Sequence, residues 1–301
     1  MQFLYFLENI RFPLLNELML LITRFGEETA FLVTALIVFW CVDKKRGYYI
    51  LAVGFLGTIL NQFLKLLCKI PRPWVLDPNF EPIPGSKEAA TGYSFPSGHS
   101  QSAVGTFGCL AVTAKEKTLR WIFAAICLLV PFSRMYLGVH TPADVLVGSG
   151  CALVLIFAMR YLNDGKYVKH TLLILSGLSV LFFVFVQFIL NPQNLDAHNY
   201  ASGLKNAYTL LGSIFGMLFV HFIDEKWLHF EVKAVWWAQI LKVCGGLGLV
   251  LAVKEGLRVP INALLGEYPG RAARYFLIVL TAGILWPLTF RWFSSFGKKE
   301  K

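Results

Sequence analysis

The sequence predicts an all-α integral membrane protein, a polytopic bundle of about nine or ten transmembrane helices. Of the 301 residues, 56% are hydrophobic and only 15% are charged, whereas a soluble domain carries about 25% charged residues. Windows of about 20 residues that are almost free of charge recur along the chain, and this length crosses a hydrocarbon core of about 30 Å. The alternating segments of about ten residues that are typical of an outer-membrane barrel do not occur.

Nine apolar runs are predicted to span the membrane. They cover residues 28–43, 48–68, 98–114, 119–138, 142–162, 168–190, 203–223, 236–253 and 273–293. A further stretch, 10–25, is short and is interrupted by Asn16, Glu17 and Arg24. It either spans poorly or lies in the membrane interface as an amphipathic helix.

The loops between these runs predict the orientation of the chain. Short basic connections at 43–47, 115–120 and 160–170 and the basic tail at 297–301 belong on the cytoplasmic side. The loop 191–202 has no Lys or Arg and is expected outside. The loop 254–272 should also be external, yet it holds Lys254, Arg258 and Arg271 and is rich in Gly and Pro, so it is a candidate to fold back towards the membrane. We expect a multi-pass protein of a bacterial cytoplasmic membrane.

Charge and cysteine usage exclude two other classes. The formal net charge of +10 would suit a nucleic-acid partner, but no soluble segment carries a basic stripe with interleaved aromatic residues. The basic loops explain the charge, and no nucleic-acid partner is predicted. The six cysteines lie in or beside apolar runs and form no CxxC pair, so buried free thiols are expected rather than disulfides or metal ligands. They are Cys41, Cys68, Cys109, Cys127, Cys151 and Cys244.

Two external segments bring ionisable residues to the same side of the membrane. These are the long loop 69–97 and the short turn near residues 139–142. Ionisable side chains at membrane depth are costly and usually mark a functional site. The candidates are Lys65, Arg72, His99, Arg134, His140 and Asp144. Three cations, two histidines and one carboxylate indicate an anion site with acid–base groups.

The stretch Ser97-Gly98-His99 begins an apolar helix. Ser97 is expected to cap that helix, which leaves the first amides free at the positive end of the helix dipole, where a phosphate binds well. Gly98 lets the backbone approach an anion without a Cβ in the way. Taken alone, this stretch could equally be a helix cap with an incidental histidine.

The stretch His140-Thr141-Pro142-Ala143-Asp144 begins another helix. Thr141 is expected as the N-cap, Pro142 as the first helical residue and Asp144 as the acid of a capping box. Asp144 could accept a hydrogen bond from one ring nitrogen of His140, which leaves the other nitrogen as a nucleophile. Alone, this pattern is also only a cap, and Arg72-Pro73 alone is only an interfacial anchor.

Together these residues resemble the type 2 phosphatidic acid phosphatase (PAP2) superfamily. Its signature, KxxxxxxRP, PSGH and SRxxxxxHxxxD, is matched at every fixed position. The matching residues are Lys65, Arg72, Pro73, Pro96, Ser97, Gly98, His99, Ser133, Arg134, His140 and Asp144. The motifs cover about residues 48–162, and the resemblance implies a six-helix catalytic core over residues 1–165.

The resemblance also implies a role for each residue. His140 would attack phosphorus and form a phosphohistidine, Asp144 would orient it, and His99 would protonate the leaving oxygen. Lys65, Arg72, Ser97, Gly98 and Arg134 would hold the phosphoryl oxygens, with Pro73, Pro96 and Ser133 in support. His140 would have to be neutral and His99 charged. No metal and no other cofactor is expected.

The expected activity is removal of phosphate from a lipid phosphate or prenyl diphosphate at the external membrane face. The apolar residues after the first motif, Trp74 to Leu76, either rest among headgroups or pack against the protein. Alternative functions are a glucose-6-phosphatase-like sugar phosphatase, a lipid phosphotransferase, and a non-enzymatic membrane protein such as a transporter.

Residues 166–301 add about four spans of unknown role, predicted to pack on the core. They contain GxxxG at Gly212 and Gly216 and a glycine cluster ending at Gly248, which indicate close helix packing or a homo-oligomer interface. Glu267, Arg271 and Arg274 could contact a headgroup, or could simply pair with other charges or anchor the helix.

Overall fold

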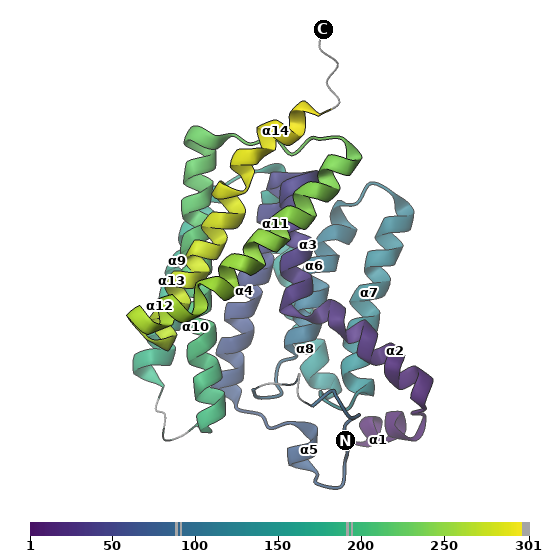
Figure 1. Cartoon of the computed structure of the whole chain (residues 1–301). Coiled ribbons are helices and arrows are strands. Elements are labelled where there is room, and N and C mark those ends of the chain that lie inside the picture. Colours follow the sequence, from purple (N-terminus) through teal and green to yellow (C-terminus); the bar gives the residue numbers. More distant parts are fainter. Residues whose placement is uncertain (88–89, 91, 191–192, 194, 297–301) are drawn as a thin grey trace. The chain divides into compact units, whose positions relative to one another are not determined.

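The computed structural model describes residues 1–87, 90, 92–190, 193 and 195–296, and its regular elements within these ranges are all helical (Figure 1). The predicted all-α class is confirmed. The α-helices are α1 (Gln2–Asn9), α2 (Pro13–Thr23), α3 (Glu28–Ile37), α4 (Lys44–Cys68), α5 (Pro73–Leu76), α6 (Gly98–Thr113), α7 (Lys117–Tyr136), α8 (Pro142–Ala158), α9 (Val168–Val184), α10 (Ala197–Ile223), α11 (Trp236–Gly256), α12 (Arg258–Leu265), α13 (Glu267–Leu280) and α14 (Phe290–Ser295).

Each of the nine predicted spans corresponds to a helix, but fewer than nine helices are long enough to cross a membrane alone. Among the described residues, six helical segments are long and apolar enough, and a seventh span is formed if the pair Pro13–Gly26 and Glu28–Val42, bent by 55°, counts as one. The short stretch 10–25 is therefore one arm of a bent pair. Helices α6 and α8 have 16 and 17 residues, about 25 Å at 1.5 Å per residue. This is shorter than a hydrocarbon core of about 30 Å, and neither helix is among the six segments.

The chain divides into two compact units, which we describe separately. The first comprises Met1–Leu32, Leu56–Arg160 and Pro192–Gly203, and the second comprises Val33–Phe55, Tyr161–Asn191 and Leu204–Lys301. Helices α3, α4 and α10 contribute residues to both units, because each runs through a boundary between them. The predicted catalytic core over residues 1–165 stays a prediction.

In the first unit, α6 packs against both α7 and α8, and α7 packs against α2 (Figure 1). Phe107 of α6 and Val130 of α7 belong to one buried hydrophobic cluster. Two glycines allow α6 and α8 to approach closely. A Cβ on Gly108 would lie 2.5 Å from Ile156 Cδ1, and a Cβ on Gly148 would lie 2.5 Å from the carbonyl oxygen of Ser97. The helix that begins at Ser97 is thus held directly against α8.

In the second unit, the predicted close packing at glycines is confirmed for α10 and α13. A Cβ on Gly212 would lie 2.1 Å from the carbonyl oxygen of Ala272, and a Cβ on Gly216 would lie 2.9 Å from Val279 Cβ. The GxxxG motif therefore serves packing within this chain. The glycine cluster of α11 is only partly used in this way, since Gly248 has open space beside it.

All six cysteines are free thiols, as predicted, but not all are buried. Cys109 is buried, whereas Cys68 and Cys244 are exposed. The prediction of burial was wrong for these two because an apolar run does not distinguish a face packed inside the protein from a face turned towards lipid.

Several predicted loop residues lie outside the described residues. They are the basic tail 297–301, positions 88, 89 and 91 of the loop 69–97, and positions 191, 192 and 194 of the loop 191–202.

Candidate active site

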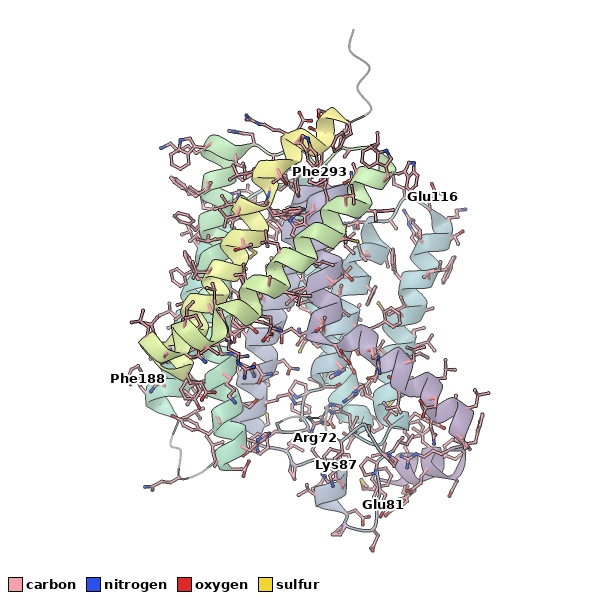
Figure 2. All side chains as sticks on the ribbon, viewed as in Figure 1. Arg72, Glu81, Lys87, Glu116, Phe188 and Phe293 are labelled. Carbon is pink, nitrogen blue, oxygen red and sulfur yellow. The ribbon has the colours of Figure 1, made fainter. Side chains whose placement is uncertain are left out.

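Every residue of the predicted active site lies in the first unit, in or beside α4, α5, α6, α7 and α8. Figure 2 shows Arg72, Glu81 and Lys87 at one end of this unit, and Glu116, in the connection between α6 and α7, at the opposite end. The site is therefore built at the end of the unit where α6 and α8 begin.

The start of α6 has the predicted N-cap. The Oγ atom of Ser97 accepts hydrogen bonds from the backbone N–H of Ser100 at 3.4 Å and from the Ser100 hydroxyl at 2.8 Å. A Cβ on Gly98 would come no closer than 3.5 Å to Asn61 Oδ1, which is ordinary contact. Packing of the protein alone therefore does not require glycine at position 98. The space beside it stays available to a ligand.

The start of α8 has the predicted capping box. Thr141 Oγ1 accepts from the Asp144 N–H at 3.3 Å, and Asp144 Oδ2 accepts from the Thr141 N–H at 2.7 Å. The N–H of Ser97 donates to the backbone carbonyl of Asp144 at 2.9 Å. The two helix starts are thus joined by a backbone hydrogen bond as well as by the close approach at Gly148.

The turn that carries His140 is held by contacts with Arg11 and Phe80. Gly138 has φ +79°, and a Cβ there would lie 2.8 Å from Arg11 Nη2 and 2.9 Å from the Phe80 ring. Arg11 donates to the carbonyl of Tyr136 from Nε at 3.2 Å and from Nη2 at 3.1 Å. Glycine is required here both by the left-handed backbone and by the lack of room. This clamp fixes the position of the histidine.

The neighbours of His140 decide which ring nitrogen carries the proton. Arg72 Nη1 lies 2.9 Å from His140 Nε2. A guanidinium can only donate, so Nε2 must be the acceptor and the hydrogen must be on Nδ1. Nδ1 lies 3.5 Å from Asp144 Oδ2 and 3.5 Å from Ser94 Oγ. The lone pair on Nε2 is the feature that a nucleophilic imidazole needs.

His140 is also kept neutral by its surroundings. Only 1% of its surface is exposed. Burial, followed by the charges of Arg72, Arg134, Lys65 and His99, holds the pKa of His140 well below its usual value. A neutral imidazole at neutral pH follows from this arrangement.

The three predicted cations are all buried, and two of them are fixed by backbone carbonyls. Lys65 Nζ donates to the carbonyl of Tyr93. Arg72 donates from Nε to the carbonyl of Gly92 at 3.0 Å and from Nη1 to the carbonyl of Val139 at 3.0 Å. Carbonyl groups orient these cations without neutralising them.

Arg134 is the cation with unused donors. It is 1% exposed, and its Nη1 donates to Thr23 Oγ1 at 2.7 Å. Its Nε and Nη2 have no hydrogen-bond partner among the described residues. His99 Nε2 is likewise buried without a partner in the described part of the chain. Buried donors left unpaired are costly, and an anion with several oxygens would satisfy them.

The supporting residues of the signature have more local contacts. Pro73 is the first residue of α5, and the carbonyl of Pro96 accepts from Asn61 Nδ2 at 3.3 Å. The hydroxyl of Ser133 donates to the carbonyl of Val130 at 2.7 Å, within α7. Ser133 thus stabilises its own helix and is not directed at the site by this bond.

Two residues at the site were not predicted from the sequence. Ser94 is fully buried, and its hydroxyl donates to Asp144 Oδ2 at 2.7 Å. No pattern in the loop pointed to it. Asn61 is buried one helical turn before Lys65 on α4, and a polar residue inside a predicted span at that spacing could have indicated it.

No group of three or more His, Cys, Asp or Glu side chains within the described ranges is placed to hold a metal ion. At this site the positive charge comes from the side chains of Lys65, Arg72 and Arg134.

Known proteins resemble the chain in both halves. Residues 46–167 match the PAP2 superfamily, and residues 208–299 match the transmembrane extension of PAP2 superfamily phosphatases. Phosphatidylglycerophosphatase B of Bacillus subtilis (strain 168) is 32% identical over 170 residues, which is 52% of this chain and 78% of that protein. Undecaprenyl-diphosphatase of Sulfolobus acidocaldarius is 31% identical over 139 residues, which is 44% of this chain and 64% of that protein.

A solved structure is also similar. The crystal structure of a transmembrane PAP2-type phosphatidylglycerolphosphate phosphatase from Bacillus subtilis is 29% identical, with a TM-score of 0.46, and covers 54% of this chain and 83% of that one.

The chain therefore belongs to the PAP2 superfamily. It is a PAP2-type phosphatase and a multi-pass membrane protein, so the non-enzymatic alternative is set aside.

Proposed function

We propose that this protein is a metal-independent phosphatase that removes phosphate from a lipid phosphate or prenyl diphosphate, through a phosphohistidine at His140. The observation that carries the proposal is the contact of 2.9 Å between Arg72 Nη1 and His140 Nε2. It gives His140 a lone pair on the nitrogen that faces the cations. The unpaired Nε and Nη2 of Arg134 add a place for phosphoryl oxygens.

Binding and attack would occur in one place. A phosphoryl group attracted by Lys65, Arg72 and Arg134 competes with Nε2 for the Arg72 N–H, which frees the lone pair. Nε2 then forms a bond to phosphorus while the bond from phosphorus to the ester oxygen breaks. The ring becomes an imidazolium, and Asp144 Oδ2, near Nδ1, stabilises the new charge. The distance of 3.5 Å is long for a hydrogen bond and is expected to shorten when substrate binds.

Leaving-group departure and hydrolysis would use His99. With the negative phosphate bound beside it, the ring is protonated and donates this proton to the leaving oxygen, which yields an alcohol or, from a diphosphate, a monophosphate. The neutral ring then takes a proton from water as the water oxygen attacks the phosphohistidine. Inorganic phosphate leaves, and His140 returns to its neutral form. The same group acts as acid and then as base, as microscopic reversibility requires.

A lipid substrate is supported by the short helix α5. Trp74 lies under Arg72, with 5.9 Å from the guanidinium carbon to the ring centroid, and under Lys87 at 5.5 Å. The neighbouring Val75 and Leu76 are 61% and 52% exposed. Apolar side chains exposed beside a phosphate site suit a substrate that keeps its acyl or prenyl chain in the membrane. The relatives named above act, by their names, on lipid phosphates and diphosphates.

The proposed location of the site is the extracytoplasmic face. The basic connection 115–120 lies at the end of the first unit opposite Arg72 and Lys87 (Figure 2). The positive-inside rule puts that connection in the cytoplasm and the site outside. The test is labelling of intact cells with a membrane-impermeant maleimide after replacing Cys68 and Cys244 with Ser. Lys87→Cys should react and Glu116→Cys should not, and the reverse result would place the site inside.

The activity is tested with detergent-purified protein in the presence of EDTA. The panel is phosphatidic acid, phosphatidylglycerol phosphate, sphingosine phosphate, undecaprenyl diphosphate and glucose 6-phosphate, measured as phosphate release. We expect activity on a lipid that is abolished by His140→Ala and retained by His170→Ala, a matched change at an exposed histidine of α9. Undiminished release by His140→Ala would refute the nucleophile. Preference for glucose 6-phosphate would refute the lipid class.

The intermediate is tested separately. Substrate carrying labelled phosphate is mixed with protein and quenched at alkaline pH, where phosphohistidine persists. Label should stay on the wild-type chain and be absent from His140→Ala. Label found on another residue would show that the covalent step differs from the one proposed.

A further inference from the structure

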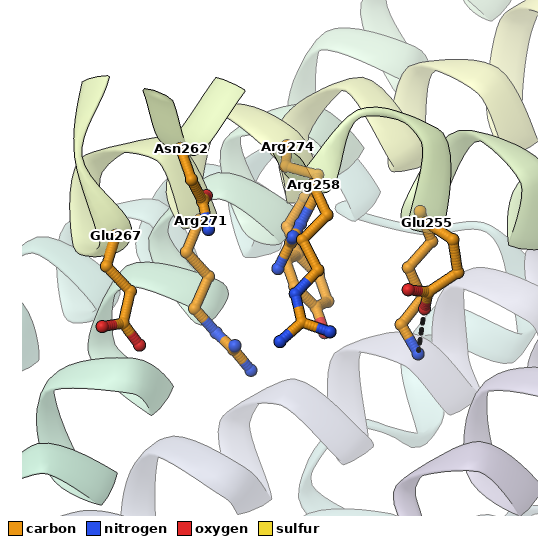
Figure 3. A pocket seen from close by; sticks show the side chains of 8 residues that line it. Glu255, Arg258, Asn262, Glu267, Arg271 and Arg274 are labelled. Carbon is orange, nitrogen blue, oxygen red and sulfur yellow. Dashed lines mark ion pairs between the residues drawn. The ribbon is translucent and has the colours of Figure 1, made fainter. Parts of the chain in front are cut away.

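The second unit holds a charged pocket that the proposed reaction does not use. It has a volume of about 270 Å³ and is formed by the end of α11, by α12 and by the N-terminal part of α13 (Figure 3). Its lining comprises Lys254, Glu255, Arg258, Asn262, Glu267, Arg271, Arg274 and Tyr275. Cationic side chains outnumber carboxylates by four to two. Figure 3 shows the guanidinium groups of Arg258 and Arg271 pointing into the same space, with Glu255 and Glu267 at its two sides.

Arg274 supplies unsatisfied donors inside this pocket. Only 5% of the surface of Arg274 is exposed, and its Nε and Nη1 have no hydrogen-bond partner in the described part of the chain. A buried guanidinium whose donors are left unpaired is strongly disfavoured. An anion in the pocket would supply the missing acceptors.

Each carboxylate of the pocket is paired with a lysine, Glu255 with Lys254 of the same lining and Glu267 with Lys205 outside it. Glu255 lies 3.9 Å from Lys254, and Glu267 lies 3.6 Å from Lys205. None of the three arginines forms an ion pair within 4.0 Å with any described residue. The charges of these three arginines are therefore not neutralised by an ion pair within the described part of the chain.

Two of the arginines, Arg271 and Arg274, are held in place before any ligand binds. Arg271 Nε donates to Thr209 Oγ1 at 2.6 Å. The guanidinium carbons of Arg271 and Arg274 lie 5.3 and 5.8 Å from the centroid of the Tyr275 ring. Gly270 keeps α12 close to α13, because a Cβ there would lie 2.9 Å from Asn262 Oδ1. A pre-organised fork of this kind binds phosphate oxygens with little loss of entropy.

The wall formed by α12 indicates where the ligand comes from. This helix has no buried residue, and its Val259 and Leu264 are 75% and 81% exposed. A short helix with exposed apolar side chains and arginine at its start suits the membrane interface, where lipid headgroups lie. Clustered basic side chains recognise anionic headgroups.

We propose that this pocket binds the phosphate group of an anionic membrane lipid, as a second anion site apart from the candidate active site. Arg258, Arg271 and Arg274 hold the phosphate oxygens, and the acyl chains lie along the apolar face of α12.

The test is lipid retention by the full-length protein. Protein is reconstituted in nanodiscs of phosphatidylcholine with or without phosphatidylglycerol, then extracted into detergent, and retained lipid is measured by native mass spectrometry. A parallel titration with inorganic phosphate and glycerol 3-phosphate, read as a shift in Tm, distinguishes a soluble phosphate from a lipid headgroup. The variants are Arg258→Gln with Arg271→Gln, Glu267→Gln, and, as a matched control, Arg291→Gln on the exposed surface of α14.

We expect the wild type and Arg291→Gln to retain phosphatidylglycerol equally. The double variant should lose about tenfold in apparent affinity, since two charge-assisted hydrogen-bond donors are removed. Glu267→Gln, which removes a competing negative charge, should bind more tightly, and this gain cannot result from misfolding. Equal retention by the double variant and the wild type would overturn the proposal. Saturation by inorganic phosphate without any preference for phosphatidylglycerol would refute the proposal that the bound phosphate belongs to a lipid.

Discussion

Replacing Gly148 with Ala should separate the two helix starts that form the candidate active site. In the structure, a Cβ at this position would lie 2.5 Å from the carbonyl oxygen of Ser97 and 3.3 Å from its backbone nitrogen. The first distance is about 1 Å shorter than the ~3.5 Å at which non-bonded atoms rest. Both neighbours are backbone atoms at the N-cap of α6, so no side-chain rotation relieves the overlap. The helices must move apart or α6 must shift.

Two effects of this change can be estimated. Overpacking of this kind costs about 1–3 kcal/mol of stability. It also strains the hydrogen bond of 2.9 Å from the Ser97 N–H to the Asp144 carbonyl. This bond joins the start of α6, which is proposed to bind phosphate, to the start of α8, which follows His140. A misplacement of about 1 Å between reacting groups lowers the rate by about 100-fold.

Gly150 provides the matched control, because it lies on the same helix and a Cβ there meets nothing within 4 Å. Gly150→Ala should leave the phosphatase rate unchanged and should raise stability by up to about 1 kcal/mol through helix propensity. The assay is phosphate release by detergent-purified variants together with their Tm. If Gly148→Ala retained the activity and Tm of Gly150→Ala, the close approach of α6 and α8 could not be what positions the site.

Three further predictions concern the site itself. Ser94→Ala removes the donor at 2.7 Å from Asp144 Oδ2 and should lower kcat about tenfold. The control is Ser176→Ala, which removes a buried hydroxyl that donates within α9 and should leave kcat unchanged. Equal kcat values for the two variants would show that Ser94 plays no part in the reaction. Arg134→Lys keeps the charge but loses the two unpaired donors, Nε and Nη2, so phosphate release should fall about 100-fold. Full activity of the lysine variant would contradict the proposal that these two donors bind phosphoryl oxygens. Burial and the nearby cations lower the pKa of His140. Its neutral form therefore contributes stability that is complete above its unfolded pKa of about 6.5 and is lost progressively as the pH falls from there towards the lower folded value. The fall in Tm between pH 7.5 and pH 5 should therefore be smaller in His140→Gln than in the wild type, and an equal fall would refute the assigned neutral state.

The division of the chain shows a limit of sequence patterns. Apolar runs and basic loops predicted every long helix, because the length and composition of a span are local properties. They predicted nine or ten spans, whereas six helical segments, or seven with the bent pair, are long and apolar enough by themselves among the described residues, since α6 and α8 are apolar but short. Neither pattern could reveal that Val33–Phe55 packs with the second unit, because grouping of helices depends on which faces fit together.

The sequence by itself determined the helical membrane class, the two helix caps at Ser97 and Thr141, and the residues of the PAP2 signature. Caps and motifs depend on neighbours within a few positions, so spacing along the chain is sufficient to indicate them. Only the tertiary structure decided how these residues are used. The contact of Arg72 with His140 that fixes the tautomer joins residues 68 positions apart, and the hydrogen bond from the Ser94 hydroxyl to Asp144 joins residues 50 positions apart. The unpaired donors of Arg134 depend on its burial. Such contacts follow from the packing of whole helices against each other, and no local pattern specifies them.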